Sequence, residues 1–174
     1  MAPAGRGSGG TGLGIGGPFT LTDGAGRTVT DADFRGRYLL VYFGYTFCPD
    51  VCPTTLNQVA EALERLGSRA DRLQTVFITV DPARDTAKVV SDYAAAFSPR
   101  IRGLTGTPEQ IASVAREYRV YYEVQKPAAA GGEYTVDHSS ILYLMDPQGH
   151  FLTPIRADQT GEQMAREIGR YLAG

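Results

Sequence analysis

Continuous apolar runs along the chain predict buried strands. Residues 39–43 are typical of a strand buried on both faces, and residues 73–80, rich in β-branched side chains, predict a second. Shorter apolar runs predict further strands at residues 101–104, 120–124 and 141–145. Turn-rich residues predict two hairpins, one joining residues 19–21 to 27–30 and one joining residues 141–145 to a strand that starts at Phe151.

Apolar residues three or four positions apart predict four helices between and after these strands. The first runs from Pro53, which suits a first helical position, to about Leu66 before Gly67. The expected caps of the other three are Asp85, Thr107 with Gln110 in a capping box, and Thr160. The last helix is expected to bury Met164, Ile168, Tyr171 and Leu172.

Strands that alternate with helices and end in a hairpin and a helix predict a three-layer α/β sandwich. The two cysteines of the chain, Cys48 and Cys52, lie on the connection between the strand at residues 39–43 and the first helix. A cysteine pair at such a junction favours a thioredoxin-like fold. We expect one domain, residues 18–174, because residues 1–17 are mostly Gly, Ala, Ser and Pro. That segment is typical of a flexible tether or a remnant left by truncation.

The spacing of Cys48 and Cys52 allows two kinds of chemistry. A helix rises about 1.5 Å per residue, so the two Cα atoms would lie roughly 6 Å apart. That distance suits a disulfide, and it equally suits two thiolates on one soft metal ion. A helix N-terminus favours thiolate over thiol, so we expect reactive sulfurs rather than a plain structural disulfide.

His138 is the third candidate ligand, because it just precedes the strand at residues 141–145. If this strand runs antiparallel beside the strand at residues 39–43, its start lies near the cysteine loop. Two sulfurs and one imidazole suit copper, whereas structural zinc wants four protein ligands. The alternative is a histidine that only satisfies a neighbouring carboxylate such as Asp137. His150, beside a turn, is expected on the surface.

Acidic residues also follow the second buried strand. Asp81 is expected at the same sheet edge as the cysteines. It could accept a hydrogen bond behind the metal ligands or face a partner, or it could merely end the strand. Arg84 and Asp85 are interpreted as turn and capping residues.

Composition narrows the function classes. The 174 residues carry a formal net charge of −2 and no basic run, which argues against nucleic-acid binding. No apolar run approaches the ~18 residues of a membrane span. Two cysteines are too few for a disulfide framework. A peroxiredoxin-type peroxidase is disfavoured, because position 45 is Tyr and Thr46 precedes Cys48 by only two residues.

Three motifs resemble signatures of one family. Residues 43–56, Phe-Gly-Tyr-Thr-Phe-Cys-Pro-Asp-Val-Cys-Pro-Thr-Thr-Leu, closely resemble the copper-site motif of the Sco/SenC family of cytochrome c oxidase assembly proteins. Residues 80–86 and 136–140 resemble its two other signatures, in the same order. The likeness runs from about Gly17 to the C-terminus. It implies a thioredoxin-like fold with an extra N-terminal β-hairpin, and Cys48, Cys52 and His138 as ligands of Cu(I), Cu(II) or both.

The resemblance also implies a function, a partner and a location. The function is that of a copper metallochaperone rather than an enzyme that turns over substrate. Copper would go to the dinuclear copper A centre of cytochrome c oxidase subunit II, and other copper chaperones or thiol reductants would be further partners. The family is typically held by an N-terminal membrane anchor, here missing, on the periplasmic side of a bacterial inner membrane or in the mitochondrial intermembrane space.

The alternative hypothesis is a thiol–disulfide oxidoreductase that keeps the acceptor's cysteines reduced. Cys48 and Cys52 would then be the redox pair, although three intervening residues differ from the thioredoxin-type two. The two roles can be coupled, because oxidation of the pair removes both sulfur ligands. Residues 125–133, rich in Ala and Gly, predict a mobile loop that leads towards His138, which copper would order.

Overall fold

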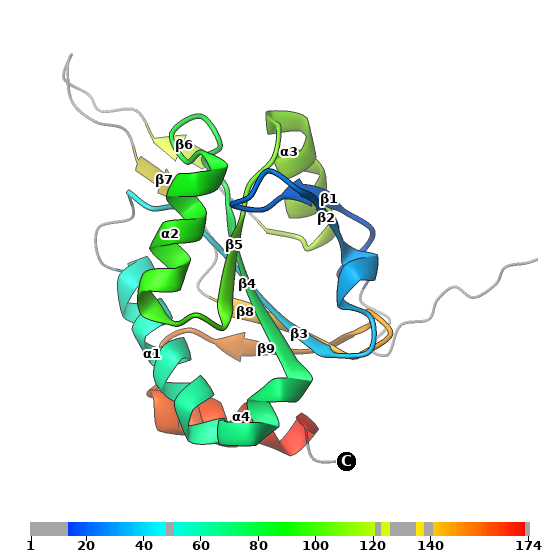
Figure 1. Ribbon diagram of the computed structural model, residues 1–174, viewed down its shortest axis with the longest axis vertical. Helices are drawn as coiled ribbons and strands as arrows, with labels where there is room; N and C mark the ends of the chain where they lie inside the picture. The colour runs from blue at the N-terminus through cyan, green and yellow to red at the C-terminus, as the bar shows by residue number, and fades with distance from the viewer. Residues whose placement is uncertain (1–13, 48–50, 121–122, 126–134, 138–140, 173–174) are drawn as a thin grey trace, which may run out of the picture.

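The computed structural model describes residues 14–47, 51–120, 123–125, 135–137 and 141–172 (Figure 1). Its strands are β1 Thr20–Thr22, β2 Thr28–Thr30, β3 Tyr38–Gly44, β4 Leu73–Thr79, β5 Ile101–Leu104, β6 Glu123–Gln125, β7 Thr135–Asp137, β8 Ile141–Met145 and β9 Phe151–Arg156. Its helices are α1 Val51–Leu66, α2 Ala87–Phe97, α3 Pro108–Glu117 and α4 Gly161–Leu172. The described residues also form the 3₁₀ helices η2 Asp31–Phe34 and η3 Gly67–Arg72.

A five-stranded sheet in the order β5-β4-β3-β8-β9 forms the centre of the molecule. Strands β3, β4 and β5 are parallel, because each is joined to the next by a helix. Strand β8 runs antiparallel to β3, with Leu39 opposite Met145 and Val41 opposite Tyr143. The predicted antiparallel pairing of these two strands is therefore confirmed, and the end of β3 faces the start of β8.

Helices cover both faces of this sheet (Figure 1). Helices α1, α2 and α4 lie on one face, and α3 with the β1–β2 hairpin lies on the other. Helix α2 rests directly on β5, since a Cβ added to Gly103 would come within 2.2 Å of the Val90 carbonyl oxygen. This is the predicted three-layer α/β sandwich with an N-terminal hairpin.

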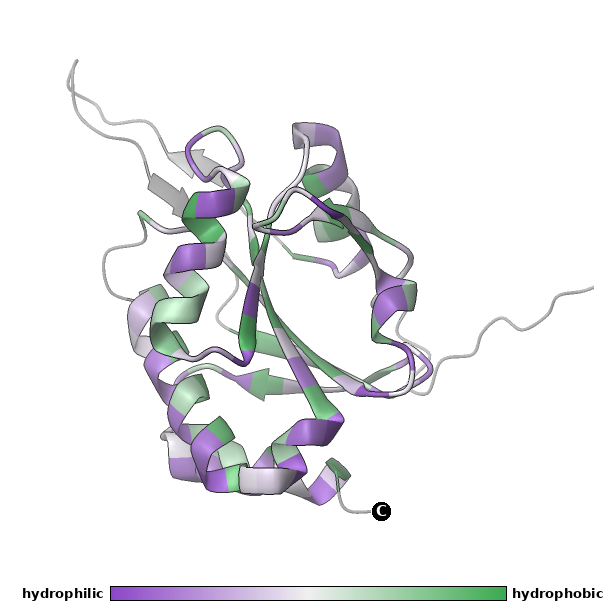
Figure 2. Cartoon of the chain, viewed as in Figure 1, coloured by the Kyte–Doolittle hydropathy of each residue, from purple (hydrophilic) through white to green (hydrophobic). Residues whose placement is uncertain are grey.

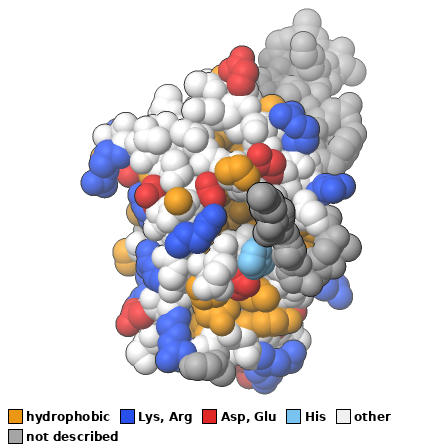
Figure 3. Space-filling view, turned by 90° about the vertical axis from the view of Figure 1, so that its right-hand side faces the viewer, with side chains coloured by type: hydrophobic (Ala, Val, Ile, Leu, Met, Phe, Trp, Pro, Cys, Tyr) orange, Lys and Arg blue, Asp and Glu red, His pale blue; other side chains and the backbone are white. Residues whose placement is uncertain are grey.

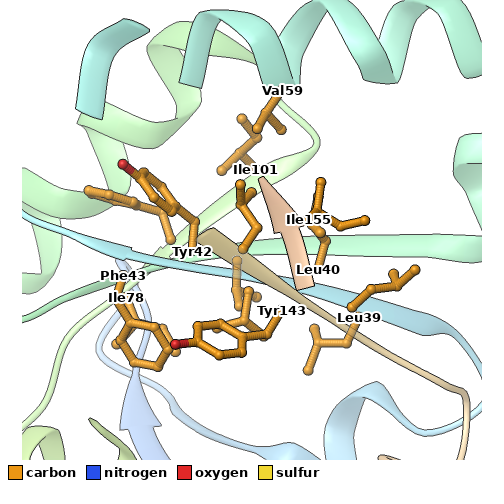
Figure 4. Packing of buried hydrophobic residues seen from close by; sticks show 14 of the residues in the cluster. Leu39, Leu40, Tyr42, Phe43, Val59, Ile78, Ile101, Tyr143 and Ile155 are labelled. Atoms are coloured by element: carbon orange, nitrogen blue, oxygen red, sulfur yellow. The ribbon is translucent and has the colours of Figure 1, made fainter. Parts of the chain in front are cut away.

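The core lies on both faces of β3, whose residues 40–43 are almost completely buried (Figure 4). Tyr42 packs against Phe77 on the face covered by α1 and α2. Phe43 points to the other face and packs against Tyr118 and Tyr143, with ring centroids 5.5 and 5.9 Å away. Hydrophobic residues concentrate on the central strands and on the helix sides turned to them (Figure 2). Burial on both faces explains why β3 is a continuous apolar run.

Several predicted elements need correction. Helix α1 begins at Val51, so Pro53 is its third residue and Cys52 already lies in the helix. The N-cap of α2 is Thr86, whose hydroxyl accepts a hydrogen bond from the Val89 N–H, and not Asp85. The strand expected at residues 120–124 is β6, which pairs antiparallel with β7, a pairing that the sequence did not predict.

The last helix is also less buried than expected. Met164, Ile168 and Leu172 lie four residues apart and are fully buried, but Tyr171 falls beside that face and keeps 37% of its surface exposed. The predicted caps at Thr107 and Thr160 are confirmed: the Thr107 hydroxyl accepts from the Gln110 N–H and the Thr160 hydroxyl from the Gln163 N–H.

Of the segment interpreted as a tether, only residues 14–17 are described. There the Gly16 N–H donates to the Glu117 carbonyl oxygen at the end of α3. Of the loop predicted at residues 125–133, Gln125 is the last residue of β6, and residues 126–133 lie outside the described part of the chain. On the face shown in Figure 3, acidic and basic side chains are interspersed.

Candidate metal centre

The candidate site lies at the sheet edge where β3 and β4 end. Gly44 stands opposite Thr79 in the parallel ladder, and the Val80 N–H donates to the Gly44 carbonyl oxygen at 2.8 Å. The segments that leave the two strands, residues 45–47 and 80–85, therefore start side by side. Asp81 is at the same edge as the cysteine loop, as the sequence predicted.

Cys52 is the second residue of α1 and is fully buried. Its Sγ accepts a hydrogen bond from the Tyr42 hydroxyl, at an O–S distance of 3.8 Å. A Cβ on Gly44 would lie 2.7 Å from this sulfur and 2.8 Å from the Phe77 ring, so only glycine fits. The sulfur is thus packed beneath the end of β3, in the first turn of a helix, with a phenol hydroxyl as its hydrogen-bond donor.

The other two predicted ligands, Cys48 and His138, lie outside the described residues. Their flanking elements are nevertheless placed. Strand β7 ends at Asp137, immediately before His138, and β8 starts at Ile141. Because β8 runs antiparallel to β3, its start lies at the edge where β3 leads towards the cysteines. Within the part of the chain that the structure describes, no three His, Cys, Asp or Glu side chains are grouped so that they could hold a metal ion.

Arg84 reaches the cysteine loop, which the sequence analysis did not foresee. Its guanidinium pairs with the Asp81 carboxylate and lies over the ring of Phe47, 4.1 Å from the ring centroid. Phe47 keeps 51% of its surface exposed and directly precedes Cys48 in the sequence. Asp81 also donates its N–H to the Thr79 hydroxyl. The turn after β4 therefore contacts the loop through a side chain as well as through the backbone.

Asp85 makes polar contacts with Thr46, at the start of the cysteine loop. Asp85 is fully buried, and its Oδ2 accepts from the Thr46 N–H at 2.9 Å and from the Thr79 hydroxyl at 2.8 Å. Its Oδ1 accepts from the Thr46 hydroxyl at 2.6 Å. This role of Asp85 was not predicted from the sequence. One feature of the sequence was compatible with it: Thr86 can cap α2 as well as Asp85 can, and if Thr86 is the cap, the Asp85 carboxylate can bind elsewhere.

His150 lies at the opposite edge of the sheet. It follows the turn after β8, near the start of β3, and its Nδ1 is 3.5 Å from an oxygen of Asp146. Its side chain is 47% exposed. The expectation of a surface residue is confirmed.

The three comparisons with known proteins agree. A family model described as SCO1/SenC matches residues 9–173. The chain belongs to this family. SenC of Rhodobacter capsulatus is 45% identical over 168 residues, which are 96% of this chain and 75% of SenC. Sco1 of Schizosaccharomyces pombe is 42% identical over 159 residues, 90% of this chain and 60% of that protein. The chain thus spans 60% of the length of Sco1 and 75% of the length of SenC.

Solved structures of the SCO1/SenC family have the same fold. The structure of Bradyrhizobium japonicum ScoI with copper bound superposes with a TM-score of 0.82 at 44% identity, covering 90% of this chain and 99% of ScoI. BsSco, described as a member of the Sco family of cytochrome c oxidase assembly proteins with a disulfide switch, shares the fold at 23% identity and a TM-score of 0.73, covering 95% of this chain and 98% of BsSco. Within the residues described here, no helix has both the length and the apolar character needed to cross a bilayer.

Proposed function

We propose that this chain binds copper during cytochrome c oxidase assembly and delivers it to the dinuclear copper A centre of subunit II. The observation that carries the proposal is the position of Cys52, buried in the first turn of α1 at the edge where β8 begins. Membership of the SCO1/SenC family and the likeness to a ScoI structure with copper bound support it.

The proposed ligands are Cys48, Cys52 and His138. Thiolates select Cu(I), and imidazole also suits Cu(II), so this donor set fits either oxidation state. Cys52 supplies a sulfur that is already packed between Gly44, Phe77 and the Tyr42 hydroxyl. Asp81 and Asp137 are proposed to support the ligands from behind, since metal-binding imidazoles and loops depend on such neighbouring acceptors.

A three-ligand site at a sheet edge suits transfer. Copper is cargo here, so the site has to bind it and also release it. The thiols of an acceptor can take up the ion by ligand exchange at an open coordination position. The proposed partners are subunit II, copper chaperones that act as donors, and thiol reductants. We place the domain on the periplasmic side of a bacterial inner membrane or in the mitochondrial intermembrane space, held by an N-terminal anchor.

The test is a titration of the reduced protein with Cu(I) in the presence of a competing chelator. We expect one ion per chain, and loss of at least about tenfold in affinity for Cys48→Ala, Cys52→Ala and His138→Ala, as for loss of a ligand or its support. His150→Ala is the matched control, because His150 is the exposed histidine at the opposite edge. Equal affinity of His138→Ala and His150→Ala would contradict the site.

A second candidate function is thiol–disulfide exchange with the same acceptor. The observation in its favour is the position of Cys52 in the first turn of a helix, where its Sγ accepts a hydrogen bond from the Tyr42 hydroxyl; redox-active cysteines commonly occupy helix N-termini. The acceptor's disulfide would be reduced to two thiols while Cys48 and Cys52 became a disulfide, and a cellular thiol reductant would restore the pair. Full biological activity of His138→Ala would favour this function, since exchange needs no imidazole.

A further inference from the structure

A buried carboxylate joins the turn after β4 to the start of the cysteine loop. Asp85 is fully buried and accepts three hydrogen bonds, two of them from the backbone N–H and the hydroxyl of Thr46. The third comes from the hydroxyl of Thr79, the last residue of β4. Burying a charged group without hydrogen-bond partners costs several kcal/mol, and a buried donor without an acceptor is also costly. Loss of either the carboxylate or its donors would therefore leave the other unsatisfied in the interior.

The backbone of Asp85 is itself held firmly. Its N–H donates to the Asp81 carbonyl oxygen at 3.0 Å, and its own carbonyl oxygen accepts from the Thr105 hydroxyl at 3.2 Å. Thr105 directly follows β5, and α2 starts two residues after Asp85. The carboxylate is therefore presented by a turn attached to two central strands and a helix.

Thr46 is the residue through which this support reaches the cysteines. It stands two positions before Cys48, in the segment that leaves β3. The other end of the same loop is fixed by α1, which contains Cys52. With Thr46 held by Asp85 and Cys52 held by the helix, the chain between them is attached at both ends.

We propose that Asp85 is a positioning residue of the cysteine loop, acting through Thr46 to fix how the chain leaves β3 towards the two cysteines. The inference rests on the proposed function only in taking Cys48 and Cys52 as the working groups. A loop held in its binding geometry loses less conformational freedom when its ligands engage, and so binds more tightly. Asp85 touches neither the ion nor the acceptor in this role.

The first experiment measures access to Cys52 in the reduced protein without metal. In a Cys48→Ser background, iodoacetamide can label only Cys52, which is fully buried and therefore reacts only when local opening exposes it. We expect Thr46→Val, which keeps the volume but removes the hydroxyl donor, to speed labelling about tenfold, the loss of one hydrogen bond to a charged group. Thr46→Ser, which keeps the hydroxyl, should stay within about twofold of the parent.

Thr107→Val is the control. It removes the N-cap hydroxyl of α3, which accepts from the Gln110 N–H on the other face of the sheet from α1, and this costs about 1 kcal/mol of stability without touching the support of Asp85 described above. We expect a lower melting temperature for both valine variants and faster labelling only for Thr46→Val. Equal labelling rates in the two variants would overturn the proposal, because the contact with Thr46 would then act on overall stability alone.

The second experiment compares Cu(I) affinity with Cys48 present. Thr46→Val should bind Cu(I) about tenfold more weakly, whereas Thr46→Ser and the control Thr107→Val should keep the parental affinity. Parental affinity for Thr46→Val would overturn the positioning role in metal binding. If the parent protein bound no copper, the proposed function would fail, and the labelling rates alone would decide the role of Asp85.

Discussion

Gly44 ends β3 at the point where the backbone of the strand meets the sulfur of Cys52. The absence of a side chain there lets Cys52 Sγ and the Phe77 ring approach the strand from one face of the sheet. The close approach of the buried sulfur requires glycine, rather than an unusual backbone conformation, because Gly44 is not among the residues with positive φ. A residue without a side chain, Gly44, thus determines how closely the Cys52 sulfur packs against the strand.

Gly44→Ala is expected to destabilise the protein by about 1 to 3 kcal/mol, because the added methyl group overpacks a core that cannot yield easily. The free energy of unfolding can be measured in urea. Gly169→Ala is a suitable control: its methyl group would meet the flexible guanidinium end of Arg69, and alanine favours a helix more than glycine. A destabilisation no larger for Gly44→Ala than for the control would contradict the proposed packing of Cys52.

Among the elements, the β1–β2 hairpin depends on one carboxylate. Asp23 Oδ1 accepts hydrogen bonds from the N–H groups of Ala25 and Arg27, and Oδ2 lies 3.0 Å from the Arg102 guanidinium on β5. Burial acts to raise the pKa of Asp23, but the two backbone donors and the two arginines outweigh it, so that the pKa is lowered. The hairpin is therefore attached to the edge of the central sheet by an ionised side chain.

Asp23→Asn should lower stability at neutral pH by about 1 kcal/mol, or the melting temperature by about 3 °C. A pKa lowered by folding contributes stability above the unfolded value of about 3.9 and loses it as the pH falls through the folded value. The difference between the variant and the parent should therefore shrink below about pH 4. Asp158→Asn, at an exposed ion pair with Arg156, should change the melting temperature little. A difference independent of pH would count against this account.

At the scale of the whole molecule, the proposed site links loops from separate parts of the chain. Cys52 belongs to α1, and His138 lies between β7 and β8, more than eighty residues later. An ion that binds only the native state would join them and stabilise the fold by mass action. Oxidation of the cysteine pair would remove two of the three proposed ligands at once.

Copper at about one hundred times its dissociation constant should stabilise the reduced protein by about 2.7 kcal/mol, a rise in melting temperature of about 5 to 11 °C. The oxidised protein should show no rise. Copper should slow hydrogen exchange in residues 125–138 of the reduced protein and leave exchange in the oxidised protein unchanged. Residues 126–134 and 138 lie outside the described part of the chain, so the ordering of this loop stays a prediction. Equal protection in the reduced, copper-bound and oxidised states would contradict a redox-gated loop ligand.

Local sequence determined most of the elements, because their signals depend on neighbours in the chain. Continuous apolar runs predicted the buried strands β3 and β4, and apolar residues at helical spacing predicted the helices. The Thr107–Gln110 capping box predicted the start of α3. The position of the cysteine pair at the junction of β3 and α1 could be predicted for the same reason. The proposed ligand set, with His138, came from these residues together with the family resemblance.

Only the tertiary structure decided how the site is supported. Asp85 and Thr46 are 39 residues apart, and no local periodicity relates them. An aspartate before a helix has the same local signal whether it caps the helix or points into the core, and here Thr86 takes the cap. The contacts of Gly44 with Cys52 and of Arg84 with Phe47 likewise arise because parallel β3 and β4 end at one edge. Such contacts follow from the folded arrangement of distant segments, whereas capping and amphipathic spacing follow from residues within one or two turns of each other.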